Sequence, residues 1–465
     1  MLIKKENGWK KYNEEENKWA FEFSEYYKKF LDKSKTEREF VVNGIAMAEK
    51  KGFRNAEEFE KFVPGDKVYY VNRGKNLILV VIGKEDIEKG VKMVVSHIDS
   101  PRLDLKQRPF YEDLEFAMMK THYYGGIKKY QWATIPLAFH GVVILENGKK
   151  VDIVIGEDET DPVFVIPDIL PHLSRKVQDE RKSRDVIKGE ELVVIAGSIP
   201  AKIDDKEIRD KVKYSILKKL NEKYGTVEED FISAEIELVP AAKARDIGFD
   251  RSLVGAYGQD DRICAYTSMI SILDISEESE PPKKTVICYL ADKEEIGSSG
   301  ATGLESKYIE YFMSDIVVKL KKNGNDHIMR KAFWNSCAIS ADVNACMDPA
   351  FKSVHDEQNA GRCGYGIIMT KFTGHGGKSG SNDADAEFVA EIREIFNREN
   401  IIWQSAELGK VDEGGGGTVA KFLSAYGMKV IDAGPGIISM HSPFEVASKL
   451  DIFETFKAYK AFLKA

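Results

Sequence analysis

Five short segments of this chain carry acidic or histidine side chains of the kind that hold metal ions. Each segment alone is ordinary, but together they offer two histidines, three carboxylates and one further glutamate. That set is sufficient to bind two zinc ions and to supply a base, so the chemistry we expect is hydrolysis at a two-metal site. The segments are residues 96–99, 258–262, 292–297, 340–342 and 440–442.

The most specific segment is Asp292-Lys293-Glu294-Glu295, which follows an apolar run. Two adjacent glutamates at such a place repel each other unless a cation holds one and the other shares a proton. We therefore expect one of them to bind metal and its neighbour to take a proton from a metal-bound water, whose pKa the metal lowers toward neutrality. The alternative is a solvated acidic turn.

His97 and Asp99 stand two residues apart, so in an extended segment both side chains point to one side. Asp99 can then orient the imidazole or a neighbouring group, and we count it among the catalytic residues. Taken alone the pair is weak evidence, because a histidine satisfied within the core shows the same pattern. Asp342, which ends an apolar run, and His441, in a loop rich in Gly, Pro and Ser, are weak when taken singly.

Asp260 and Asp261 precede Arg262 and a run that has a helical pattern. A carboxylate shared by two cations is the simplest way to bring them within about 4 Å of each other without prohibitive repulsion. A helix N-cap with an ion pair is the alternative, and both hold if one aspartate caps while the other bridges. Residues 297–303 lack the Gly-Lys-Ser/Thr ending of a phosphate-binding loop, so we expect backbone that fits closely around the site.

Apolar runs that alternate with helical patterns must position these side chains. Three of the five segments directly follow an apolar run, so they should converge at the carboxyl edge of one sheet. We therefore predict an α/β fold with a mainly parallel sheet flanked by helices. The predicted strands are residues 77–82, 91–95, 285–290, 337–340 and 429–432, and the predicted helices follow Asp261, lie near Lys307 and span residues 385–397.

The stretch from residue 105 to residue 247 has a different texture, with aromatic and β-branched runs and a probable hairpin turn at Asn147-Gly148. None of the five segments lies in it. We predict an inserted β-rich domain, which divides the catalytic domain into residues 1–104 and 248–465. Within the insert we expect a mobile loop at residues 178–184 and a helix at residues 205–224, and near the N-terminus two amphipathic helices between residues 11 and 50.

Composition excludes several classes of protein. A chain of 465 residues with 43% hydrophobic content can bury a sizeable core. Its net charge of −8 and its lack of a basic stripe with interleaved aromatics argue against nucleic-acid binding. We see no signal peptide and no apolar run of about 18 residues, so we expect a cytoplasmic protein without a membrane partner. The five cysteines include no Cys-x-x-Cys pair and are predicted to be buried, reduced thiols.

With these residues in place, the chain resembles the aspartyl aminopeptidase family of dinuclear zinc exopeptidases over nearly its whole length. Four motifs are similar to the signatures of that family and stand in the family's order. They are Ser-His-Ile-Asp-Ser-Pro-Arg-Leu-Asp, Gly-Gln-Asp-Asp-Arg, Asp-Lys-Glu-Glu-Ile-Gly-Ser and Met-His-Ser-Pro-Phe-Glu. The resemblance implies that Glu294 is the general base. The ligands that it implies are His97 and Asp342 on one zinc ion, Glu295 and His441 on the other, and Asp260 between them.

The resemblance also implies that the inserted domain, residues 105–247, serves oligomerisation and substrate gating. It further implies a tetrahedral homo-dodecamer whose enclosed active sites admit only peptides. His172, in Pro171-His172-Leu173-Ser174-Arg175, resembles a histidine that stabilises the transition state in a neighbouring subunit, although a plain surface residue is the alternative. Lys371 stands where relatives contact substrate. The sequence departs from the animal branch of the family at residues 343–349 and 374–380, which leaves the preferred N-terminal residue open.

We therefore expect a dinuclear metal-dependent aminopeptidase that removes an N-terminal residue, Asp or Glu, from peptides with a free N-terminus. Zinc is the expected metal, and cobalt and manganese accept the same ligands. One alternative is a broad or basic-residue aminopeptidase on the same site, and another is a deacylase for amide-linked acyl groups. A third is a non-enzymatic peptide-binding or assembly protein on a peptidase scaffold, against which Glu294 argues because binding needs no base.

Overall fold

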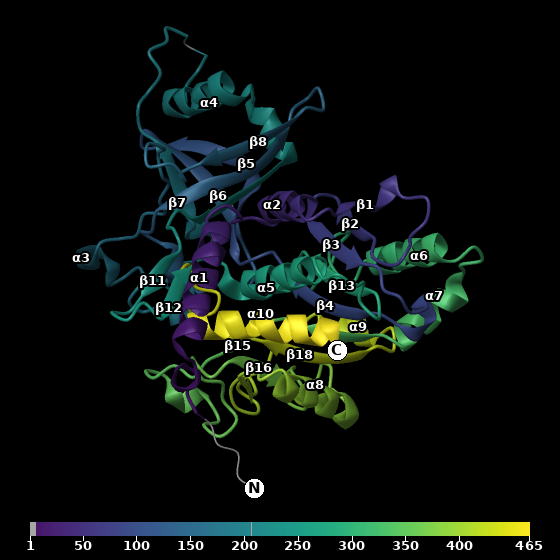
Figure 1. Ribbon diagram of the computed structural model, residues 1–465. Coiled ribbons are helices and arrows are strands. Elements are labelled where there is room, and N and C mark those ends of the chain that lie inside the picture. Colours follow the sequence, from purple (N-terminus) through teal and green to yellow (C-terminus); the bar gives the residue numbers. More distant parts are fainter. Residues whose placement is uncertain (1–5, 206) are drawn as a thin grey trace. The chain divides into compact units, whose positions relative to one another are not determined.

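The computed structural model describes residues 6–205 and 207–465 (Figure 1). The chain divides into two compact units. Unit 1 holds residues 6–99, 244–440 and 444–465, and unit 2 holds Ser100–Lys243 together with His441–Pro443. Among the described residues, no helix combines the length and the apolar character needed to cross a membrane.

Unit 1 is an α/β structure built on a nine-stranded mixed sheet. Its centre is parallel, because β4 pairs in parallel with both β13 and β14, and β14 pairs in parallel with β18. Antiparallel pairs flank this centre, β3 with β13 on one side and β16 with β18 on the other. In sheet order the strands are β1 (Arg54–Asn55), β2 (Lys67–Asn72), β3 (Asn76–Val81), β13 (Val286–Ala291), β4 (Lys92–His97), β14 (Cys337–Ser340), β18 (Lys429–Gly434), β16 (Ile367–Thr370) and β17 (Trp403–Ser405).

Helices cover both faces of this sheet, which explains why its central strands are apolar throughout. Successive residues of a strand point to opposite faces, and accordingly Val94 packs into one core cluster and Val95 into the other. One cluster lies against α1 (Glu14–Leu31), α2 (Glu37–Lys50), α5 (Gln259–Ile275), α8 (Ala386–Arg398) and α10 (Lys449–Lys464). The other lies against α6 (Tyr308–Leu320), α7 (Asp326–Trp334) and α9 (Ala420–Ser424).

The elements predicted for this unit are confirmed, with ends shifted by one or two residues. The two N-terminal helices are α1 and α2, and each begins at a capping box, Asn13 with Glu16 and Thr36 with Glu39. The predicted cysteine environment is partly wrong. All five cysteines are free thiols, but Cys363 is only half-buried, because it lies in a surface loop before β16.

A second, smaller sheet of unit 1 was not foreseen from the sequence. Its five strands contain two to four residues each, too few for apolar periodicity to mark them. It matters for the site because it joins the strand before Asp260 to the strand after His441. In order, its strands are β11 (Arg245–Ile247), β12 (Leu253–Ala256), β20 (Glu445–Ser448), β19 (Gly436–Ile438) and β15 (Asn344–Ala345).

Unit 2 contains a six-stranded antiparallel sheet. The predicted hairpin at Asn147-Gly148 is confirmed, since β7 and β8 pair across it and the Asn147 side chain accepts the Lys149 N–H. In order, the strands are β8 (Lys150–Ile155), β7 (Leu137–Ile144), β10 (Ala234–Pro240), β5 (Arg102–Asp113), β6 (Phe116–Tyr124) and β9 (Val193–Gly197).

The helix predicted at residues 205–224 begins later than expected, at Lys211. The observed α4 spans Lys211–Tyr224. Asp205 instead accepts the N–H of Glu207 at 2.9 Å, a local turn that competes with the helical hydrogen bonds. Lys206 lies outside the described residues.

Candidate metal centre

The carboxyl edge of the central strands brings the predicted side chains of unit 1 together. His97 is the last residue of β4, Asp342 follows β14 by two residues, and Glu294 and Glu295 form a short 3-10 turn after β13. Since β13, β4 and β14 are neighbours in the sheet, their ends lie side by side. Asp260 reaches the same edge from the first turn of α5.

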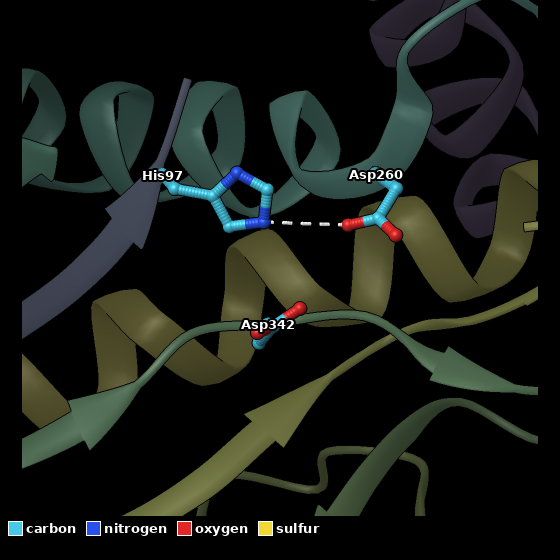
Figure 2. Close-up of side chains that lie close together, drawn as sticks. All are labelled: His97, Asp260 and Asp342. Atoms are coloured by element: carbon cyan, nitrogen blue, oxygen red, sulfur yellow. Dashed lines mark ion pairs between the residues drawn. The ribbon is translucent and has the colours of Figure 1, made fainter. Parts of the chain in front are cut away.

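His97, Asp260 and Asp342 form a cluster that fits a divalent metal ion (Figure 2). Each offers one ligand atom, and these atoms all lie within 4.8 Å of one another. The Nε2 atom of His97 is 3.4 Å from Oδ1 of Asp260, and both residues are buried. One imidazole nitrogen with two carboxylate oxygens is a donor set that zinc accepts.

Asp260 is also close to a second potential ligand. Its carboxylate and that of Glu295 offer oxygen atoms within 4.8 Å of each other. Asp260 therefore lies near His97 and Asp342 and near Glu295 at the same time, as a carboxylate shared by two metal ions must.

His441 lies in the short segment His441–Pro443, which clusters with unit 2 although both of its ends continue into unit 1. Its Nδ1 is 2.8 Å from the carbonyl oxygen of Gly126. An N–H on Nδ1 that donates to this carbonyl makes Nε2 the acceptor nitrogen, which is the tautomer that a metal-binding histidine needs.

Asp99 connects His97 to the two glutamates. Its carboxylate oxygens accept the backbone N–H groups of Glu294 and Glu295, each at 3.2 Å. The same carboxylate is 3.3 Å from Nδ1 of His97, whose Nδ1 also lies 3.1 Å from the Asp99 carbonyl oxygen. One buried aspartate thus orients both the imidazole and the turn that carries the glutamates.

The electrostatics of this cluster call for a cation. Burial lowers the pKa of His97, but its hydrogen bonds with Asp260 and Asp99 outweigh that effect and hold the pKa well above its ordinary value. Burial raises the pKa of Asp342 well above its usual range, and the neighbouring Asp261 carboxylate adds to the rise. Carboxylates thus outnumber positive charges here. A divalent ion would favour the ionised carboxylates and the neutral imidazole.

Glu294 adjoins the candidate ligands without belonging to their group. Its Oε2 atom is 4.0 Å from Nε2 of His97, and its side chain is half-buried. It belongs to neither group of potential ligand atoms within unit 1, whereas Glu295 does. A carboxylate that adjoins a metal cluster without binding the metal is suited to proton transfer.

The structure places the two remaining predicted residues outside this cluster. His172 is exposed in the four-residue helix α3 (Pro171–Ser174) of unit 2. Lys371 follows β16 and lines a cavity of about 650 Å³ together with Arg393 and Trp403. Thr370, the residue before Lys371, accepts a hydrogen bond from Asn344, which stands two residues after Asp342.

Glu445 is a residue of the site that the sequence reasoning missed. Its carboxylate accepts the backbone N–H of Asp260 at 3.0 Å. The signal was present, since Glu445 ends the motif Met-His-Ser-Pro-Phe-Glu. Its role was hidden because it contacts a ligand through the backbone, in a strand too short to predict.

Comparison with known proteins agrees with this geometry. Residues 30–463 match the family model described as aminopeptidase I zinc metalloprotease (M18). A probable M18 family aminopeptidase 1 of Borreliella afzelii is 56% identical over 99% of this chain and 100% of its own length. Its counterpart in Clostridium acetobutylicum is 51% identical over 100% of this chain and 99% of its own length.

Solved structures give the same result for the fold. The crystal structure of an M18 family aminopeptidase from Thermotoga maritima is 45% identical, covers 100% of both chains and superposes with a TM-score of 0.93. More distantly, the structure of a Saccharomyces cerevisiae mApe1 dodecamer is 21% identical, covers 95% of this chain and 96% of its own, and has a TM-score of 0.75. The chain belongs to the M18 family of zinc metallo-aminopeptidases.

Proposed function

We propose that this metallo-aminopeptidase uses two divalent metal ions and removes an acidic residue, Asp or Glu, from the N-terminus of peptides. The observation that carries the two-metal proposal is the position of Asp260. Its carboxylate lies within 4.8 Å of potential ligand atoms of His97 and Asp342, and also within 4.8 Å of a carboxylate oxygen of Glu295. His97 and Asp342 would hold one ion with Asp260, and Glu295 would hold the other. His441 completes the second set as its histidine ligand.

Divalent ions bound to this donor set would lower the pKa of water and polarise the scissile carbonyl. The protein's own contribution is proton transfer and orientation. Glu294 takes the proton from the attacking water and passes it to the departing amine. Asp99 keeps Glu294 and His97 in place through the contacts described above.

Two cations that line one cavity beside β16 support a preference for an acidic first residue. Lys371 and Arg393 line the same cavity, and within the described part of the chain neither side chain forms an ion pair. A carboxylate side chain of the substrate would gain a charge-assisted contact there. The alternative, a broad or basic-residue aminopeptidase, uses the same metals with no role for these two cations.

Assembly is part of the proposal. The Saccharomyces cerevisiae relative is a dodecamer, and we propose a tetrahedral homo-dodecamer for this chain as well. The exposed position of His172 fits a residue that acts in the active site of a neighbouring subunit. The catalytic and substrate contacts of His172 and Lys371 are proposals of the same kind.

The proposed function is tested by reconstituting the apo protein with zinc, cobalt or manganese. Metal content is measured together with hydrolysis of Asp-, Glu-, Lys- and Leu-anilides. We expect two ions per chain and preferential cleavage of the Asp and Glu substrates. Preferential cleavage of Lys or Leu substrates would overturn the acidic preference, and full activity with a single ion would overturn the two-metal site.

A further inference from the structure

Asp260 lies where the backbone is not helical, although it falls within the first turn of α5. Its φ and ψ angles are −82° and 108°, and Gly258 before it has a left-handed backbone with φ of 68°. N–H groups in the first turn of a helix have no partner within the helix. The geometry of Asp260 must therefore be held by groups outside α5.

Glu445 supplies that support from β20. Its Oε2 atom accepts the Asp260 N–H at 3.0 Å, and its carbonyl oxygen accepts the Nε2–H of Gln259 at 2.7 Å. Gln259 also donates to the carbonyl of Val254 at 3.1 Å. Glu445 thus binds the two residues on which the position of the Asp260 carboxylate depends, and both Glu445 and Gln259 are buried.

The strand that carries Glu445 is itself fixed in register. β20 pairs with β12, and Glu445 lies opposite Ala256, shortly before α5 begins. Gly255 in β12 allows the ring of Phe444, the residue before Glu445, to pack closely against β12, because a Cβ atom at Gly255 would lie 2.4 Å from that ring. Glu445 therefore acts from a paired strand rather than from a loop, which suits a residue that must hold a geometry.

We propose that Glu445 is a positioning residue of the metal centre: its carboxylate holds the backbone of Asp260 so that the Asp260 side chain can be shared by two metal ions. This inference rests on the bridging role of Asp260 in the proposed function. Glu445 need not touch metal or substrate to act in this way. A hydrogen bond from N–H to a carboxylate is about twice as strong as one to a neutral acceptor, so the negative charge of Glu445 strengthens its hold on the Asp260 backbone.

The direct readout is the dissociation constant of the divalent metal, measured by titrating apo protein with zinc. Loss of a partner that orients a metal ligand typically weakens metal binding by about 10- to 100-fold, and we expect a loss of that size for Glu445→Ala. Glu445→Gln keeps the shape and an amide oxygen acceptor but loses the charge. We therefore expect a smaller but measurable loss for this variant, of about three- to tenfold.

Glu454→Ala is a matched control. Glu454 is also a buried glutamate that accepts a backbone N–H, from Ile402 at 2.8 Å. Its other hydrogen bonds come from the hydroxyl of Tyr12 and from Lys457 in α10, so none of its partners is a predicted metal ligand. We expect Glu454→Ala to lower the melting temperature of the apo protein and to leave the zinc dissociation constant unchanged. Comparison of the two sites separates an effect on metal binding from the general cost of losing a buried carboxylate.

Two results would overturn the inference. One is a zinc dissociation constant for Glu445→Ala that matches the wild type or the Glu454→Ala control. The other, decisive if Glu445→Ala does not fold, is wild-type zinc affinity in folded Glu445→Gln. Failure of the wild type to bind any divalent ion would instead contradict the proposed metal centre itself, so the two failures are distinguishable.

Discussion

Replacing Asp99 by alanine tests whether one carboxylate aligns the histidine ligand with the proposed base. The change removes two hydrogen bonds from the backbone of Glu294 and Glu295 to a charged acceptor, and it removes one of the two carboxylate partners of His97. A hydrogen bond to a charged group contributes about 1.5–3 kcal/mol, and because the glutamate turn is half-buried we take the lower end for each. The sum is about 3 kcal/mol, or roughly a 100-fold loss in kcat/KM.

The assay is hydrolysis of aminoacyl-anilides at saturating zinc, with metal content and melting temperature measured on the same samples. Asp99→Asn retains one side-chain oxygen acceptor, so its loss should be smaller, roughly tenfold. Asp385→Ala is the control, since Asp385 accepts the N–H of Phe388 as the N-cap of α8, and its loss should cost about 1 kcal/mol of stability without lowering kcat/KM. The reasoning is refuted if Asp99→Ala, fully loaded with metal, works within threefold of wild type.

Three further predictions concern stability. Burial raises the pKa of Asp451 to about 8. The hydrogen bonds from the N–H groups of Gly364 and Gly366 lower this pKa, and the negative charge of Glu454 raises it further. Because the unfolded chain releases this proton near its ordinary pKa of 3.8, the stabilising contribution is complete below that pH and is lost as pH rises to about 8. Asp451→Asn should therefore flatten the pH dependence of urea unfolding between pH 5 and 8, and an unchanged slope would contradict it. Phe388→Ala, on the buried face of α8, should lower the free energy of unfolding by about 3–5 kcal/mol, and a loss below 1 kcal/mol would contradict the burial of this side chain. Zinc at about 1,000 times its dissociation constant should stabilise the fold by about 4 kcal/mol, an effect that a chelator reverses and that an unshifted melting temperature would disprove.

The parts of the site that could be predicted from sequence are those carried by long apolar strands. His97 ends one buried strand and the Glu294–Glu295 pair comes shortly after another, and the rule that such strand ends meet at one sheet edge was enough to bring them together. The same rule predicted the position of Asp342, which lies two residues after the end of β14. The strands β13, β4 and β14 are recognisable because they are buried on both faces and therefore apolar throughout.

Other features depend on contacts that leave little trace in local sequence. The non-helical backbone of Asp260 arises from a hydrogen bond to Glu445, far along the chain. The small sheet around it has strands of two to four residues, below the length at which alternation is visible. The late start of α4 has a local cause, the Asp205 turn, but the charged residues there fit a helical pattern equally well.

The central claim, metal-dependent aminopeptidase chemistry with Glu294 as the base, is tested most directly by Glu294→Gln. Its kcat for Asp- and Glu-anilides should be compared with wild type after both proteins are shown to bind two metal ions. Glutamine keeps the shape of the side chain but cannot take the proton, so the account predicts full metal content and a loss of kcat of about 100-fold or more. A fully loaded variant with wild-type kcat would contradict the account.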